Sequence, residues 1–325
     1  MRNKVLSVAL LVILLISAAG FGGCAKKADK VTVTLDWTPN TNHTGLYVAK
    51  DKGYFAAEGL EVEIIQPPVG MGDQLVGSNQ AQFGVSNQEA VTLARLEEIP
   101  IVSIAAVIQH NTSGFASLKS KGIETPKDFE GKRYGGWGSP IEEATIKALM
   151  DKYGADAGKV EILTTGSADF LATSEANADF SWIFYGWDGI AAEVKGVELN
   201  YIKLTEAEPI LDYHTPVLIT NEENIANNPE LVRKFLAAVK RGYEFTIANP
   251  DKAAEILLAS APELDRDLVL ASQRWLSDKF QADAPAWGEQ KPEVWANYLN
   301  WLVTNNLVEK TTEIEKAFTN EYLPK

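Results

Sequence analysis

Short apolar strands and amphipathic helices alternate along the first two thirds of the chain. Residues 31–35 alternate strictly between apolar and polar, which is typical of a strand with one buried face. Residues 101–108 are mostly apolar, as expected for a strand that is buried on both faces. Because such strands alternate with helices of about ten residues, we predict an α/β fold with largely parallel sheets.

The predicted elements form two α/β cycles and a helical C-terminal part. The expected strands are 31–35, 60–65, 83–86, 101–108, 132–134, 159–163, 180–184 and 201–204. The expected helices are 44–52, 72–79, 89–97, 141–153, 169–176, 186–195, 229–249, 251–260, 265–280 and 292–305. No low-complexity linker separates the two cycles, so we expect paired crossings between two lobes, at 108–118 and 210–219.

The N-terminus has the pattern of a bacterial export signal. Arg2 and Lys4 precede an uncharged apolar run, and small residues lead to Cys24, the single cysteine of the chain. A basic start, about 15 apolar residues and small residues before the cut are typical of a secretory signal peptide. We expect removal of residues 1–23, a lipid on Cys24 that anchors the protein to the outer face of the cell membrane, and a tether over 24–30.

The length of the mature chain predicts two lobes. About 300 residues remain after processing, more than one hydrophobic core usually contains. We place 31–112 and 211–325 in lobe 1 and 113–210 in lobe 2. The apolar run of the leader is too short to cross a membrane, because a spanning helix needs about 20 residues.

Charge and metal-ligand content exclude several classes of function. The net charge is −14, or −16 once the leader with its two basic residues is removed. Nucleic-acid binding requires clustered Lys and Arg, so this acidic balance argues against it. We expect no metal site, because the only cysteine is assigned to the anchor and the three histidines, His43, His110 and His214, are far apart in sequence.

The loop after the first strand is a candidate binding loop that contains Trp37, Asn40 and His43. In open α/β sheets, ligands bind beyond the carboxyl ends of the strands, and a helix N-terminus adds amide donors. Trp37 can stack on a planar ring while Asn40 and His43 hydrogen-bond to it. The alternative is a structural loop, in which Asn42 caps the next helix and Trp37 packs on the surface.

A glycine-rich segment forms the second candidate loop. Ser139 and Glu142, with Pro140 in the first helical position, form a capping box that needs no further function. A cap does not require Trp137 between glycines, which expose the indole to a ligand. We therefore predict that Trp137, Gly138 and Ser139 line a pocket, in addition to starting a helix.

Aromatic residues and an aspartate follow the strand expected at 180–184. Because alternate residues of a strand point to opposite faces, only those at its end are candidates for a pocket. We predict that Tyr185 and Trp187 contact a ligand and that the Asp188 carboxylate accepts hydrogen bonds from an amino group on a heteroaromatic ring. A carboxylate that only stabilises a helix N-terminus has the same pattern and stays open as an alternative.

Smaller signals add candidate contacts from other turns. They are Ser86, Asn87, Ser113, Tyr213 and Thr215. Each also fits ordinary turn chemistry or a hinge without ligand contact. Because the chain has no GxSxG elbow, no Walker loop and no GxGxxG after a strand, the sequence favours a binding cleft over an enzyme. We expect no catalytic residue and no cofactor.

Several motifs together resemble the NMT1/THI5-like solute-binding proteins. Residues 35–40 read LDWTPN, 46–49 read LYVA and 53–60 read GYFAAEGL, and the likeness continues through 100–103, 136–140 and 216–219. It covers most of the mature chain. The resemblance implies a two-lobed periplasmic-binding-protein fold of type II with two hinge crossovers, in which the lobes close over a ligand.

The resemblance also implies a ligand and partners. Within the family, the chain looks most like lipoproteins that capture thiamine pyrimidine precursors (hydroxymethylpyrimidine or formylaminopyrimidine) for the permease and ATPase of an ABC importer. Such a receptor would be a monomer. Family members stack the pyrimidine on aromatic side chains and use a carboxylate on its amino face. The candidates for these roles are Trp37, Trp137, Tyr185 and Trp187 for stacking and Asp188 for the carboxylate.

Two departures from the family pattern leave the ligand open. Asp188 is shorter than the expected glutamate, and Ser86 stands where a bulkier aromatic residue can occur. Both changes reshape the pocket, so riboflavin or another small heteroaromatic solute stays possible. A sulfonate-like ligand would favour an arginine, and the candidate loops have none. The pyridoxal-phosphate-consuming synthases of this group carry a cysteine-rich motif that this chain lacks, which argues against synthase activity.

Overall fold

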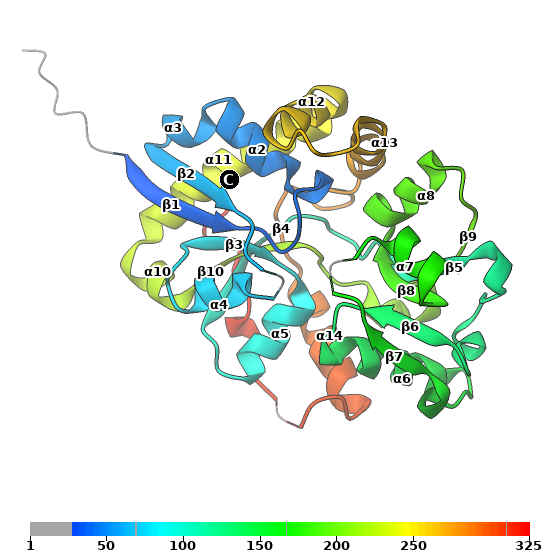
Figure 1. Ribbon diagram of the computed structural model, residues 1–325. Helices are drawn as coiled ribbons and strands as arrows, with labels where there is room; N and C mark the ends of the chain where they lie inside the picture. The colour runs from blue at the N-terminus through cyan, green and yellow to red at the C-terminus, as the bar shows by residue number, and fades with distance from the viewer. Residues whose placement is uncertain (1–27, 69, 167, 310) are drawn as a thin grey trace, which may run out of the picture.

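The computed structural model describes residues 28–325 except 69, 167 and 310, and it contains two five-stranded sheets. Each sheet is the centre of one lobe (Figure 1). The predicted signal peptide and Cys24 lie outside the described residues. Within the described ranges, none of the helices is long and apolar enough to cross a membrane.

The first sheet has the strand order β2–β1–β3–β10–β4. Strands β1, β2 and β3 are parallel, while β10 is antiparallel to both of its neighbours. The strands span Asp29–Thr34 (β1), Leu60–Ile65 (β2), Phe83–Ser86 (β3), Ile101–Ala106 (β4) and Val217–Asn221 (β10). The chain is therefore already in the sheet at Asp29, two residues before the predicted start, and the predicted tether overlaps β1.

The second sheet repeats this arrangement, with the order β7–β6–β8–β5–β9. Here β6 is parallel to β7 and β8, and β5 is antiparallel to β8 and β9. The strands span Ser113–Leu118 (β5), Arg133–Gly136 (β6), Glu161–Thr164 (β7), Phe180–Phe184 (β8) and Leu199–Lys203 (β9). Each sheet thus has four strands in one direction and one in the other, so the prediction of largely parallel sheets missed one reversed strand in each.

The reversed strands come directly after the two crossings between the sheets. Strand β4 ends at Ala106 although the apolar run continues, because the Val107 N–H bonds to the Pro216 carbonyl of the other crossing at 2.9 Å. The first crossing then enters β5, and the second enters β10. These two adjacent crossings match the expected two-lobed fold.

Helices cover both faces of each sheet. The helices span Thr44–Asp51 (α2), Tyr54–Ala57 (α3), Gly72–Gly77 (α4), Gln88–Leu96 (α5), Pro140–Lys152 (α6), Phe170–Ala176 (α7), Ile190–Val194 (α8), Leu204–Ala207 (α9), Glu222–Asn227 (α10), Pro229–Ala248 (α11), Pro250–Ser260 (α12), Arg266–Leu276 (α13) and Pro292–Thr304 (α14). Helices α2 and α11 pack together on the first sheet, where the rings of Phe83 and Phe235 stack with centroids 3.8 Å apart. Helix α6 buries its apolar side on the second sheet.

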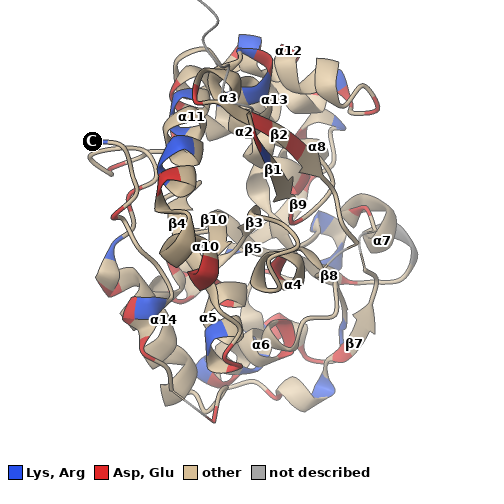
Figure 2. Ribbon diagram, turned by 90° about the vertical axis from the view of Figure 1, so that its left-hand side faces the viewer, with Lys and Arg blue, Asp and Glu red and all other residues tan. Residues whose placement is uncertain are grey.

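Several strands carry no charged residue, so helices can cover them on both sides without burying a charge. Strands β3, β4, β5 and β10 consist of apolar, small and uncharged polar residues, and they are tan in Figure 2, while helices such as α6 and α11 carry Lys, Arg, Asp and Glu. The charge of the chain therefore lies mainly outside the two sheet cores.

Helix α14 contributes to the cores of both lobes. Trp295 packs in a cluster with residues of the first sheet, whereas Tyr298 and Trp301 pack in the cluster of the second sheet. Its place between the lobes is visible in Figure 1. The division of the chain at 112/113 and 210/211 remains a proposal, and α14 is the part of 211–325 that contacts both sides.

Candidate functional site

The predicted binding residues lie mainly at the carboxyl ends of β1, β3, β6 and β8. In α/β sheets, this edge is where ligands bind. Both lobes therefore contribute loops to the candidate site. The local contacts show which side chains are free to meet a ligand and which are used by the loops themselves.

In the loop after β1, Asn40 and His43 are buried and bond within the loop. The Asn40 side chain accepts from the Asn42 N–H (2.9 Å) and donates to the Thr38 carbonyl (3.0 Å). His43 Nδ1 accepts from the Asn40 N–H (3.2 Å), so Nε2 donates to the Asp36 carboxylate at 2.7 Å. Both side chains shape the loop and orient Asp36 in this structure.

Trp37 is half-buried and lies between Asp36 and this turn, so part of its indole is accessible. Asn40, rather than the expected Asn42, is the residue that caps the first helical turn. Asn42 instead offers its carbonyl to the buried Tyr243 hydroxyl at 2.7 Å. The loop is therefore held by hydrogen bonds on its buried side, while the Trp37 side chain stays partly exposed.

The glycine-rich loop after β6 is organised around the buried Glu142 carboxylate. One oxygen accepts from the Tyr134 hydroxyl (2.6 Å) and the Trp137 N–H (3.0 Å), and the other from the N–H groups of Gly138 (2.8 Å) and Ser139 (2.6 Å). The predicted capping box is confirmed. The carboxylate does more than cap the helix, because it accepts hydrogen bonds from donors along the whole loop.

Glycine at position 136 allows this arrangement. A Cβ on Gly136 would lie 2.0 Å from the Glu142 carboxylate, and Gly138 has φ +99, a conformation that favours glycine. The Trp137 indole is half-buried and meets Trp182 edge-on, with ring centroids 5.5 Å apart. The core ring of Trp182 thus contacts Trp137, while part of Trp137 stays exposed.

The turn after β8 is a π-helical turn, Tyr185–Gly189, where the sequence predicted an ordinary helix. Tyr185 and the rings of Tyr201 and Trp275 line a cavity of about 440 Å³ beside the crossings. Trp187 packs in the apolar cluster of α12 and α13. Tyr185 therefore faces a space between the lobes, whereas Trp187 contributes to their contact.

The Asp188 carboxylate has little hydrogen bonding to compensate for its loss of water. It accepts one hydrogen bond, from the Phe184 N–H at 3.3 Å. Loss of water on burial, together with the charge of Asp169, raises its pKa to about 7. An acid in this state can donate or accept a hydrogen bond near neutral pH, so Asp188 can pair with either kind of group on a ligand.

The sequence missed a second acid at the edge of the first sheet, Asp73. It lies in the first turn of α4 and accepts from the Ser86 hydroxyl at 3.0 Å. Burial and the nearby Asp36 raise its pKa to about 6. The Pro- and Gly-rich segment before α4 follows β2, and this place after a strand could have pointed to Asp73.

The remaining predicted residues have structural roles here, as a helix cap or as buried side chains near the crossings. Asn87 caps α5 through the Ala90 N–H (2.7 Å), and Ser113 donates to the Asn111 side chain. The buried Tyr213 hydroxyl donates to Glu89 at 2.6 Å, and buried Thr215 precedes a cis proline. Their hydrogen-bond partners agree with the hinge and turn alternatives.

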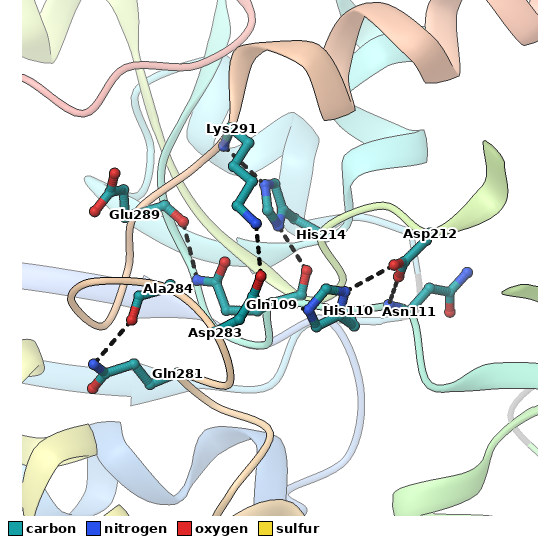
Figure 3. Close-up of polar contacts among 10 residues, drawn as sticks. All are labelled: Gln109, His110, Asn111, Asp212, His214, Gln281, Asp283, Ala284, Glu289 and Lys291. Atoms are coloured by element: carbon teal, nitrogen blue, oxygen red, sulfur yellow. Dashed lines mark hydrogen bonds and ion pairs between the residues drawn. The ribbon is translucent and has the colours of Figure 1, made fainter. Parts of the chain in front are cut away.

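Two histidines bind the crossings to the C-terminal segment in opposite protonation states (Figure 3). His214 Nδ1 lies 2.9 Å from the Gln109 carbonyl and Nε2 lies 3.1 Å from the Lys291 N–H, so the ring is neutral and burial lowers its pKa to about 4. His110 contacts Asp212 (2.8 Å) and Asp283 (2.9 Å) with its two ring nitrogens. Carboxylates only accept, so His110 binds both as imidazolium, and they raise its pKa.

We expect these histidines to give opposite pH dependences of stability. The unfolded chain binds a proton at position 214 more readily than the folded protein does, so this stabilisation is lost as pH falls from about 6.5 to about 4, by on the order of 3 kcal/mol. His214→Asn retains a donor for the Gln109 carbonyl and should flatten this acid limb in urea unfolding curves. His110→Asn is the control, because the His110 contribution is lost as pH rises. An unchanged acid limb in His214→Asn would contradict this account.

The family model described as NMT1/THI5 like matches residues 40–253. The chain is 29% identical to the formylaminopyrimidine-binding protein of Halalkalibacterium halodurans, over 98% of each chain. It is 26% identical to the riboflavin-binding protein RibY of Chloroflexus aurantiacus, over 100% of this chain and 99% of that protein. It is also 28% identical to a 4-amino-5-hydroxymethyl-2-methylpyrimidine phosphate synthase of Saccharomyces cerevisiae, over 74% of each.

Among solved structures, the alkanesulfonate-binding protein SsuA of Xanthomonas axonopodis pv. citri has the same fold. The TM-score is 0.70 over 89% of this chain and 98% of that one, at 13% sequence identity. Together with the two sheets and their crossings, this confirms the periplasmic-binding-protein fold of type II. At this identity the likeness concerns the fold alone.

Proposed function

Because this chain belongs to the NMT1/THI5-like family, we propose that it is an extracytoplasmic solute-binding protein that captures a thiamine-pathway aminopyrimidine between its lobes. The observation that carries the proposal is the chemistry of the loops at the strand ends. They combine accessible indoles with half-buried carboxylates from both lobes, Asp73 and Asp188.

The charges in these loops favour a ligand that donates hydrogen bonds. The segments 36–43, 66–73, 86–89, 136–139, 164–169 and 184–188 contain no Lys or Arg. Carboxylates whose pKa is raised by burial gain from a partner that donates an N–H or carries positive charge. An amino group beside a basic ring nitrogen, as in an aminopyrimidine, supplies both.

The aromatic residues supply the flat surfaces that such a ring needs. Trp37 belongs to the first lobe and Trp137 to the second, and each is half-buried at the end of a parallel strand. A planar ring between two indoles buries apolar area from both lobes as they close. The named binding function of the relative at 29% identity supports this ligand class.

Riboflavin is the second candidate, favoured by the relative RibY and by the small Ser86 side chain beside Asp73. A sulfonate is a poorer candidate for these loops, because they carry no Lys or Arg. The cavity beside Tyr185 is, however, also lined by Lys203, Lys279 and His110, so sulfonate binding is measured as well. The two heterocycles differ in size and in their hydrogen-bond donors, so direct binding measurements separate them.

The same proposal covers transport and anchoring. We propose that Cys24 carries a lipid after removal of residues 1–23, and that the receptor delivers its ligand to the permease and ATPase of an ABC importer. Mass spectrometry of the membrane fraction tests the anchor. The expected result is a diacylated N-terminal peptide that begins at Cys24, and its absence in Cys24→Ser.

We propose binding without turnover, although synthases are among the relatives. The single cysteine of the chain cannot provide a cysteine-rich motif of the kind expected in those enzymes. The purified protein should stay colourless when pyridoxal phosphate is added and removed, and should release no pyrimidine product. A stable yellow complex would overturn this part of the proposal.

Calorimetry of the soluble protein tests the ligand. We expect 4-amino-5-hydroxymethyl-2-methylpyrimidine or its formylamino relative to bind, and Trp37→Ala to weaken binding by about tenfold or more because one stacking surface is lost. Trp37→Phe keeps an aromatic face and should lie between the two. Binding of riboflavin but of neither pyrimidine would favour the second candidate, and no binding to any of them would refute the assignment.

A further inference from the structure

Ser272, in the C-terminal part of the chain, contacts candidate ligand loops of both lobes. It is fully buried on α13, and its hydroxyl donates to the Gly186 carbonyl in the turn after β8. The Thr41 hydroxyl lies 2.5 Å from the Ser272 oxygen. Because Ser272 has a single hydroxyl hydrogen and a carbonyl only accepts, Thr41 must donate to Ser272. The hydrogen bonds therefore run from Thr41 through Ser272 to Gly186.

This chain of hydrogen bonds joins the two lobes. Thr41 belongs to the loop after β1 in the first sheet, and Gly186 to the turn after β8 in the second. Helix α13 packs on α12, which packs on α2, so it is held by the first lobe. It also contacts α8 of the second lobe, and Figure 1 shows α13 at the border of the lobes.

Packing around Gly186 shows how closely α13 approaches the turn. A Cβ on Gly186 would lie 2.9 Å from Leu276 and 3.0 Å from Trp275, two side chains of the same helix. The Trp275 ring also meets Tyr185 with centroids 5.5 Å apart. Water is excluded here, so the hydrogen bonds through Ser272 are stronger than surface ones and their loss leaves unpaired groups.

We propose that Ser272 is a positioning residue that sets the closed arrangement of the two ligand loops and slows ligand release. This inference rests on the proposed function for the site, but the contact itself does not depend on the ligand. Opening of the lobes would separate Thr41 from Gly186, because they belong to different lobes. The chain of hydrogen bonds therefore stabilises the closed form relative to the open one.

Ser272→Ala tests this with two readouts, the radius of gyration from small-angle X-ray scattering and the dissociation rate of 4-amino-5-hydroxymethyl-2-methylpyrimidine in stopped flow. We expect a larger radius without ligand and dissociation faster by about tenfold or more, because the variant loses both buried hydrogen bonds of the Ser272 hydroxyl. Ser277→Ala is the matched control, since its hydroxyl donates to the Arg274 carbonyl within the same lobe at 2.9 Å. Thr41→Val removes the other donor and serves if Ser272→Ala does not fold.

The outcomes separate the positioning role from the proposed ligand. If the wild type binds the pyrimidine but Ser272→Ala and Thr41→Val match Ser277→Ala in both readouts, Ser272 has no positioning role and the ligand assignment stands. If no pyrimidine binds but Ser272→Ala expands the free protein, the positioning role stands and the ligand assignment is wrong. A lower melting temperature without either change would indicate packing alone and would also refute the proposal.

Discussion

Replacement of Asp188 by Asn should weaken aminopyrimidine binding by about 10- to 100-fold and leave the protein at least as stable. The carboxylate offers two acceptor oxygens to a ligand and is bound by a single N–H of the protein, from Phe184. Asn has one acceptor, and its amide N–H groups would face the donors of the ligand, so a buried pair is lost. The affinity is measured by calorimetry at neutral pH.

The stability of the same variant gives an independent check. The folded protein holds a proton on Asp188 up to a pKa of about 7, whereas the unfolded chain releases it near 4. The folded state therefore binds more protons between these values, so this group makes stability fall as pH rises from about 4 to about 7. Asp188→Asn removes that slope, and urea unfolding at several pH values should show a flatter profile.

A matched control for Asp188→Asn is Asp151→Asn on the exposed side of α6, where the carboxylate pairs with Lys147. An exposed pair contributes little, so neither binding nor the pH profile should change. Wild-type affinity in Asp188→Asn would exclude Asp188 from the site and leave Asp73 as the candidate carboxylate. Equal losses in both variants would indicate a nonspecific effect of charge.

Elements with a strong local pattern could be predicted from the sequence. The strands expected at 60–65, 83–86 and 180–184 have the observed bounds of β2, β3 and β8, because each is a compact apolar or alternating run. Strand β5 was missed as a sheet strand and treated as part of a crossing. Its residues, Ser113–Leu118, combine small and polar residues with only Phe115 and Leu118 as large apolar ones, and they form a strand by pairing with β8 and β9.

The side-chain roles in the site were less predictable than the loops that carry them. Sequence position after a strand makes the loop of Asn40 and His43 a candidate, but in the structure their hydrogen bonds turn inward to the loop. A motif shows which residue types are present, while the tertiary contacts determine which atoms stay free. Ser272 had no sequence signal, because its partner Thr41 is 231 residues away.

Removal of the Glu142 carboxylate should have the largest effect on stability of the changes considered. Glu142→Ala leaves the Tyr134 hydroxyl and the N–H groups of Trp137, Gly138 and Ser139 without their acceptor. Hydrogen bonds to a charged group contribute about 1.5–3 kcal/mol each, and water can replace those at the exposed end of the loop. We expect a loss of about 3 kcal/mol or more in the free energy of unfolding, measured in urea.

Comparison with Glu142→Gln tests whether the charge or only the shape is needed. Each carboxylate oxygen accepts from two donors, so the amide nitrogen of Gln would face two hydrogens and cannot accept them. Glu142→Gln should therefore behave more like Ala than like the wild type, and it should also weaken pyrimidine binding because the loop no longer holds Trp137 in place. Glu143→Ala is the control, since Glu143 is exposed in the same first turn of α6. Equal stability of Glu142→Gln and the wild type would mean that the loop is held by its glycines and helix cap alone.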